Sequence, residues 1–282
     1  MAQKRIAAIN DISGFGKCSL TVALPILSAL GCSTSVVPTA VLSTHTGEEF
    51  SGYTYRDLTP DLNDFLAHWL RLGLSFDAIY SGYLGSFAQI DMVSGMFESF
   101  KSANTIIMVD PVMGDNGKLY SLYTPQMASE LSSMCKKADI ITPNITEAAF
   151  LTGMPYKEAP HSREYIIELM KRLFEFGCKH VVITGVCLSE DEIGVACGSL
   201  GSSIAFFMEG RYKAFYSGTG DIFASALLGL MLKGLNLECA AELAAKYITR
   251  CIERTWSSGV PHFYGINFEE ELPWLFSQMS SV

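Results

Sequence analysis

The feature that most constrains this chain is the alternation of short apolar segments with longer amphipathic ones. The segment KHVVITG, residues 179–185, is typical of a buried strand, and residues 162–177 before it carry apolar side chains at helical spacing. Strands that alternate with helices are joined by crossover connections and therefore lie parallel in one sheet. We predict an α/β fold with a doubly wound, mostly parallel central sheet and helices on both faces.

The same pattern assigns most of the chain. We expect a hairpin over residues 192–210 and further helices that end near Met279. The predicted strands cover residues 5–10, 33–38, 76–83, 105–111, 139–144 and 179–185. The predicted helices cover residues 18–31, 59–73, 86–101, 124–138, 146–153 and 162–177.

One stretch, residues 41–58, breaks the alternation. It is polar, rich in Thr, Ser and Gly, and too long for a simple connection. We predict that it forms a small flap with two short strands outside the main sheet. No segment resembles an interdomain linker, so residues 1–282 are predicted to form a single domain that carries this flap.

Composition excludes several classes of function. A net charge of −9 argues against a nucleic-acid-binding protein, which usually shows a basic patch. The eight cysteines form no CxxC pair, which is typical of reduced thiols in a cytoplasmic protein. The N-terminal segment lacks the apolar stretch of a secretory signal, and no apolar run is long enough to cross a membrane. We therefore expect a cytoplasmic protein with neither nucleic-acid nor membrane partners.

Polar residues follow the predicted strands, and in an open α/β sheet ligands bind beyond the carboxyl ends of the strands. We expect these residues to line one edge of the sheet. They are Asn10 and Asp11, residues 81–83, Asp110, residues 142–144, Thr184 and Gly185.

The stretch YSGTGDIFAS, residues 216–225, combines a flexible turn with the start of a helix. Gly218 and Gly220 allow the N–H groups around Thr219 to converge on one spot, where the helix dipole also favours an anion. Asp221 lies in the first turn and could accept a proton from a hydroxyl that attacks a phosphoryl group. The alternative is that Thr219 or Asp221 simply caps the helix.

Two more turns carry acids. DPVMGD contains Asp110 and Asp115, and TPNITEA contains Asn144 and Glu147. Carboxylate and amide oxygens with intervening water suit Mg²⁺. Each turn alone is common, but the three occurring in this order at strand ends indicate a site.

Other motifs fail on inspection. In SGFGKCS, residues 13–19, a phosphate-binding P-loop would need a glycine at Asp11 and a serine or threonine at Cys18. The dinucleotide fingerprint would need a glycine at Ser19. The five histidines form no metal cluster, and no G-x-S-x-G nucleophile elbow occurs.

The ordered set D-P-V-M-G-D, T-P-N-x-x-E and G-T-G-D resembles the ribokinase-like superfamily, most closely its pyridoxal/pyridoxamine kinase branch. The resemblance covers nearly the whole chain and includes STHTG in the flap and SGYLGS after the third predicted strand. In the related hydroxymethylpyrimidine kinases a cysteine often follows the second glycine, where this chain has Asp221.

This resemblance implies ATP-dependent phosphorylation of the 5′-hydroxymethyl group of pyridoxal, pyridoxine or pyridoxamine. Asp221 would be the general base. Gly218, Thr219 and Gly220 would form the anion hole, with Thr219 also on the ATP side. Four residues would face the nucleotide phosphates and Mg²⁺: Asp110, Asn144, Glu147 and Thr184. Asp115 and Glu147 would reach the metal through water, and the pyridine ring would be surrounded by Asp11, His45, Thr46 and Tyr83.

The family also implies a homodimer and a response to a monovalent cation such as K⁺. This chain departs from several family members in having Asp11 where they have serine, which leaves the preferred vitamer open. Two alternatives remain: a hydroxymethylpyrimidine kinase of the same fold, and a non-catalytic sensor of a vitamer or nucleotide. The presence of Asp221 argues against the sensor.

Overall fold

The predicted alternation of strands and helices is confirmed in the computed structural model, which describes residues 2–212 and 216–279. The strands are β1 (Arg5–Ser13), β2 (Ser33–Leu42), β3 (Tyr55–Asp57), β4 (Ala78–Ser81), β5 (Ile106–Val109), β6 (Gly114–Asp115), β7 (Lys118–Leu119), β8 (Ile140–Ile141), β9 (His180–Val186), β10 (Glu192–Ser199) and β11 (Ala205–Gly210). The helices are α1 (Leu20–Ala29), α2 (Thr59–Arg71), α3 (Phe87–Phe100), α4 (Pro125–Cys135), α5 (Ile145–Thr152), α6 (Arg163–Phe174), α7 (Thr219–Leu232), α8 (Leu237–Ser258) and α9 (Leu272–Met279). Three short 3₁₀ helices, η1 (Glu48–Phe50), η2 (His262–Tyr264) and η3 (Glu269–Glu271), complete the assignment.

Over the described residues, the central sheet has nine strands in the order β11-β10-β9-β8-β5-β4-β1-β2-β3. The six strands from β9 to β2 in that order pair in parallel, as predicted. The antiparallel hairpin β10–β11 closes one edge, which confirms the hairpin expected over residues 192–210. A separate ribbon pairs β6 with β7.

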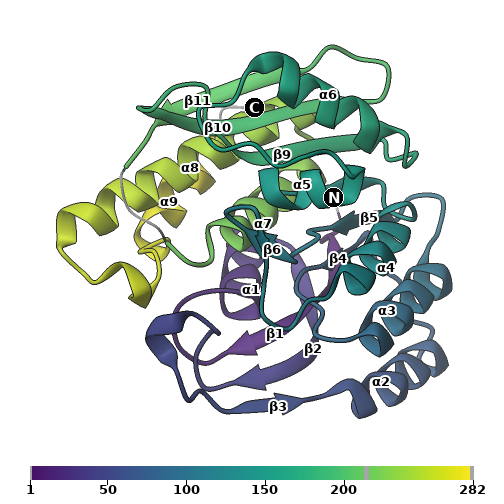
Figure 1. Ribbon diagram of the computed structural model, residues 1–282. Helices are drawn as coiled ribbons and strands as arrows, with labels where there is room; N and C mark the ends of the chain where they lie inside the picture. Colours follow the sequence, from purple (N-terminus) through teal and green to yellow (C-terminus); the bar gives the residue numbers. More distant parts are fainter. Residues whose placement is uncertain (1, 213–215, 280–282) are drawn as a thin grey trace.

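Helices cover both faces of this sheet (Figure 1). Successive residues of β1 alternate between two cores: Ala7 and Ile9 belong to the one that includes residues of α3, α4 and α6, whereas Ile6 and Ala8 belong to the one with α1, α7 and α8. A strand that is buried on both sides needs apolar residues throughout, which explains the short continuous apolar segments of the sequence.

The register of the parallel strands aligns their carboxyl ends. Ile9 pairs with Ser81, Ser81 with Val109, and Val109 with Ile141. The residues that follow, including Asn10 and Asp110, therefore emerge at the same edge of the sheet, where the sequence predicted a site.

The flap differs from the prediction, because its strand is not separate from the main sheet. Strand β3 pairs antiparallel with the end of β2 and forms the edge of the central sheet. The buried Gln89 side chain holds this edge in place: its amide nitrogen donates to the Thr39 carbonyl oxygen and to Asp57 Oδ1. Within the described residues of the flap, β3 and the end of β2 are its strands.

Among the residues that the structure describes, no helix is both long enough and apolar enough to span a membrane.

Candidate active site

The turn at residues 218–221 starts helix α7 without a side-chain cap. Gly218 is the N-cap residue, in the left-handed conformation at φ 80°. A Cβ at this position would collide with the carbonyl oxygen of Lys17, so the turn packs directly on the loop after β1. Thr219 and Asp221 do not cap the helix, which removes the simple structural alternative for this stretch. Because no described side chain caps these first N–H groups, they are left for water or a ligand.

Asp221 is held by both of its carboxylate oxygens. Asn10 Nδ2 donates to Oδ1 at 3.2 Å, and the Ser19 N–H donates to Oδ2 at 2.9 Å. Burial raises the pKa of Asp221 to about 6, and the negative charge of Asp11 also acts to raise it, whereas the two hydrogen bonds act in the opposite direction. A carboxyl with this pKa changes its protonation state close to neutral pH, as a general base requires.

Asp110 faces the same turn from the end of β5. Its carboxylate Oδ2 lies 3.7 Å from the position that a Cβ on Gly220 would occupy. Asp110 is only 5% exposed, and burial, with the charge of Asp221 as the second cause, raises its pKa to about 8. Two acids are therefore brought together beside the uncapped helix start.

The turn after β8 holds itself together through Asn144 and Glu147. The Asn144 side chain accepts from the Glu147 N–H at 2.9 Å, and Glu147 Oε2 accepts from the Asn144 N–H at 2.7 Å, which is a capping box at the start of α5. Glu147 Oε1 accepts from the Met113 N–H, and Asn144 Nδ2 donates to the Gly114 carbonyl oxygen. Both residues thus tie the DPVMGD loop to α5.

These contacts bear on the predicted metal ligands. Both Glu147 oxygens are occupied by backbone donors, and Asp115 Oδ1 accepts from the Asn116 N–H at 2.8 Å. In the described residues no three His, Cys, Asp or Glu side chains are grouped closely enough to hold a metal ion. The carboxyls here suit a hydrated cation that keeps its water ligands better than a site made of direct protein ligands.

Thr184 lies beside this turn, because it forms a parallel bridge with Asn144 and its N–H donates to the Pro143 carbonyl oxygen. Gly185 follows with φ 69°, and a Cβ added to it would meet nothing within 4 Å. The end of β9 therefore faces open space, on the side where the sequence placed the nucleotide.

The predicted ring site centres on Asp11, which is 5% exposed. Ser19 Oγ donates to Asp11 Oδ1 at 2.6 Å, and Ser13 Oγ donates to Oδ2 at 2.9 Å. Burial is the main reason that the pKa of Asp11 is raised. The charge of Asp11 also acts on His45 and on Tyr83, so the structure brings these three residues to one region.

His45 reaches this region from the flap. Its Nδ1 accepts from the Gly47 N–H at 3.0 Å, so a neutral ring carries its proton on Nε2. The imidazole packs directly against Gly16, which has φ 109° and leaves no room for a side chain. Burial lowers the pKa of His45. Thr46, by contrast, is exposed.

Three residues near these groups were not among the predicted site residues. Asn10 and Ser19 contact Asp221, and Tyr55 of β3 lies near Asp11, whose charge helps to raise its pKa. Asn10 stood among the polar residues at strand ends, a signal that could have included it. Tyr55 belongs to the flap and could have been found only by knowing that β3 joins the sheet edge.

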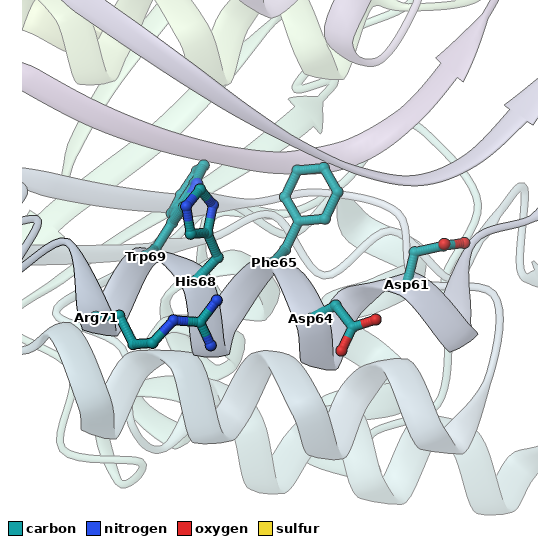
Figure 2. Close-up of a pocket in the computed structure, with 6 residues that line it drawn as sticks. All are labelled: Asp61, Asp64, Phe65, His68, Trp69 and Arg71. Carbon is teal, nitrogen blue, oxygen red and sulfur yellow. The ribbon is translucent and has the colours of Figure 1, made fainter.

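A separate depression of about 370 Å³ lies on α2 (Figure 2). Its walls come from one helix alone, and none of the predicted site residues belongs to it. It is lined by Asp61, Asp64, Phe65, His68, Trp69 and Arg71.

Solved structures share this fold over nearly the whole chain. A pyridoxal kinase from Lactobacillus plantarum superimposes with a TM-score of 0.90 at 29% identity, covering 99% of this chain and 98% of that one. A Bacteroides thetaiotaomicron protein provisionally named phosphomethylpyrimidine kinase, crystallised with pyridoxal, gives a TM-score of 0.92 at 38% identity, covering 97% and 96%. The fold and the strand-end site define this chain as an ATP-dependent small-molecule kinase of the ribokinase-like class.

Sequence comparison identifies the family. The model of the phosphomethylpyrimidine kinase family matches residues 24–265, and the chain belongs to this family. A pyridoxine/pyridoxal/pyridoxamine kinase from Bordetella avium is 29% identical, covering 89% of this chain and 85% of its own length. The pyridoxal kinase of Ovis aries is 30% identical, covering 81% and 78%.

Proposed function

We propose that this chain is a pyridoxal/pyridoxamine kinase, which transfers the γ-phosphoryl group of ATP to the 5′-hydroxymethyl group of a B6 vitamer. The observation that carries the proposal is the position of Asp221 directly beside the uncapped start of α7 at Gly218. Phosphoryl transfer to an alcohol needs a proton acceptor and an anion-binding nest within reach of the same phosphorus atom. This turn supplies both.

In the proposed reaction the Asp221 carboxylate accepts the proton of the 5′-hydroxyl as that oxygen bonds to the γ-phosphorus. The bond from the γ-phosphorus to the bridging oxygen breaks, and ADP leaves with the electron pair. N–H groups of Thr219 and Gly220 bind the oxygens on which negative charge develops, and Gly218 allows the turn that aims them.

On the nucleotide side we propose that Asp110, Asn144, Glu147 and Thr184 position the phosphates and a hydrated Mg²⁺. The charges acting on the buried Asp110 and Glu147 come from other carboxyls, so a bound divalent cation would relieve their repulsion. Because the Glu147 oxygens already accept backbone N–H groups, Asp115 and Glu147 would act on the metal through water. Mg²⁺ would neutralise charge on the phosphates.

On the acceptor side we propose that Asp11, His45, Thr46 and Tyr83 surround the ring. The charge of Asp11 acts on both His45 and Tyr83, which supports the proposal for these three residues. Thr46 is an exposed residue of the flap. The Bacteroides relative crystallised with pyridoxal and the names of the kinases from Bordetella avium and Ovis aries support a B6 vitamer as acceptor.

We further propose that the enzyme is a cytoplasmic homodimer in which residues 1–282 form one domain, and that a monovalent cation such as K⁺ promotes activity. Family resemblance supports these assignments. Light scattering would measure the mass of the particle against the 30.8 kDa of the chain, and assays in K⁺ and in tetramethylammonium would test the cation.

The second candidate is a hydroxymethylpyrimidine kinase, which the description of the matching family favours. A coupled ADP-release assay with pyridoxal, pyridoxine, pyridoxamine and hydroxymethylpyrimidine separates the candidates. We expect turnover of at least one B6 vitamer with a higher kcat/KM than that of the pyrimidine. Turnover of the pyrimidine alone would replace the proposal with the second candidate, and no turnover of any of the four would favour a sensor.

A further inference from the structure

Asn10 lies between the predicted ring site and Asp221. It is only 1% exposed, follows the regular pairing of β1 with β4, and uses both polar atoms of its side chain in hydrogen bonds. Its Oδ1 accepts from the Asp11 N–H at 3.0 Å and from the Tyr83 N–H at 2.9 Å, while Nδ2 donates to Asp221 Oδ1. One amide therefore joins β1, the segment that follows β4 and helix α7.

The orientation of this amide follows from its partners. Two backbone N–H groups require the oxygen on their side, so the NH₂ group must face Asp221. Gly82 keeps the amide in place, because a Cβ at residue 82 would collide with Asn10 Nδ2. Asn10 thus presents a donor to the carboxylate in a fixed geometry.

Ser19 holds the other oxygen of Asp221 and reaches the ring site as well. It stands at φ 56° and ψ −135°, a conformation that is strained for a residue with a side chain. It is the N-cap of α1, yet its hydroxyl does not cap that helix and donates to Asp11 instead. Its N–H donates to Asp221, so Ser19 bridges the two carboxyls.

We propose that Asn10 is a positioning residue: it orients the Asp221 carboxylate towards the acceptor hydroxyl and favours the ionised form of that carboxylate. Ser19 links Asp221 to Asp11 of the proposed ring site. This inference rests on the proposed function, because it assumes that Asp221 is the base. It assigns a role to a residue outside the sets predicted to surround the ring and to face the nucleotide.

The surroundings of Asp221 make these two donors matter. Burial and the charge of Asp11 both oppose ionisation, and the hydrogen bonds from Asn10 and Ser19 favour it. Among the described residues, the titratable groups whose pKa shifts are linked to Asp221 are acids or become negative when they ionise. They are Asp11, Asp110, Cys18, Tyr80 and Tyr120.

The test is the pH dependence of kcat/KM for a vitamer that the wild type phosphorylates. Asn10→Ala removes the donor, and we expect the acid limb to move up by about 1 pH unit. Asn10→Asp keeps the shape and the acceptor but places a second carboxyl against Asp221, so its upward shift should be larger. If Asn10 had a purely structural role, Asn10→Ala would impair the enzyme more than Asn10→Asp, since Asp preserves more contacts than Ala.

Two controls separate this effect from loss of stability. Asn236→Ala removes an asparagine that caps α8, and should lower Tm without moving the acid limb. Gly82→Ala should move the acid limb upward while Asn10 itself is not replaced. Gly95→Ala in α3, where a Cβ meets nothing within 4 Å, should leave the acid limb where it is. The comparison of Gly82→Ala with Gly95→Ala keeps the test informative if the Asn10 variants do not fold.

Acid limbs of the Asn10 and Gly82 variants that coincide with the wild-type limb would overturn the inference while leaving the kinase assignment in place. A wild type that phosphorylates none of the vitamers would instead overturn the proposed function itself.

Discussion

Asp221 shows that the chemistry of a residue depends on neighbours that are distant in sequence. Burial and the charge of Asp11 raise the pKa of its carboxyl, whereas the hydrogen bonds from Asn10 and Ser19 lower it. A proton acceptor must be ionised before it can act. The raised pKa therefore places the loss of activity at a pH only slightly below neutral.

We predict that kcat/KM for the preferred vitamer falls as the pH drops through about 6, because protonation of Asp221 removes the base. The slope on the acid side should correspond to one proton. Initial rates from about pH 4.5 to 8 at constant ionic strength would measure it, with a second vitamer as a control for ionisation of the substrate. A limb near pH ~4, the ordinary range of an aspartate, would show that burial does not act on the base in this way.

At this scale the sequence indicates individual acids but not the contacts that they make. Asp110 and Asp221 were expected at one site and do lie close together, but the hydrogen bond from Asn10 to Asp221 joins residues 211 positions apart. Glu147 was predicted as a metal-facing acid, although Asn144-x-x-Glu147 is also a capping-box pattern that can be recognised in the sequence. The structure places both of its oxygens on backbone donors.

Among the elements, the start of helix α7 is the one on which the site depends most. It has no side-chain cap, and its N-cap Gly218 has φ 80° with the Lys17 carbonyl oxygen where a Cβ would be. A helix with glycine at its N-cap gives up roughly a few tenths of a kcal/mol relative to one with a capping side chain. Such an arrangement is useful where the first N–H groups of the helix bind an anion.

We predict that Gly218→Ala lowers kcat by ~10-fold or more, because the clash and the positive φ both move the turn that aims the N–H groups. Gly259→Ala is the matched control. Gly259 has φ 67° at the end of α8, but a Cβ there meets nothing within 4 Å. This control should lose about 1 kcal/mol of unfolding free energy and keep its activity. Equal activity in the two variants would contradict the role of this turn.

The alternation of apolar segments predicted nearly every element, since strands buried on both faces and helices buried on one leave distinct periodicities. The short β6–β7 ribbon was not predicted, and the flap was predicted incorrectly. Residues Tyr55–Asp57 are exposed and polar, so nothing in their pattern distinguishes an added edge strand from a separate one. Their pairing depends on β2, which extends to Leu42, beyond its predicted end.

At the scale of the whole molecule, the site contains acids from three separate segments of the chain. Among the described residues, the charges that act on these acids include no compensating base. Asp110, Glu147 and Asp221 all have raised pKa values, with burial as the first cause. Above about pH 4 these carboxyls ionise freely in the unfolded chain, whereas in the folded protein they stay protonated to a higher pH. Stability contributed by their protonated forms is therefore lost as the pH rises.

We predict that Asp110→Asn raises the Tm of the ligand-free protein by about 4 °C at about pH 8, because asparagine cannot ionise. The gain should disappear near pH ~4, where Asp110, with a pKa of about 8, is protonated in the fold and about half protonated in the unfolded chain. Thermal unfolding followed by circular dichroism at both pH values would measure it. Asp64→Asn on the exposed face of α2 changes the same charge and should leave Tm nearly unchanged. A destabilised Asp110→Asn at the higher pH would mean that the charge is compensated.

The central claim is that Asp221 takes the proton of a vitamer hydroxyl during transfer from ATP. The most direct measurement compares the rate of pyridoxal 5′-phosphate formation from pyridoxal and ATP by the wild type and by Asp221→Asn, with ATP affinity measured separately. We predict a loss of ~10²-fold or more in kcat for the variant, with ATP binding largely retained. Near-wild-type turnover by Asp221→Asn would contradict the account.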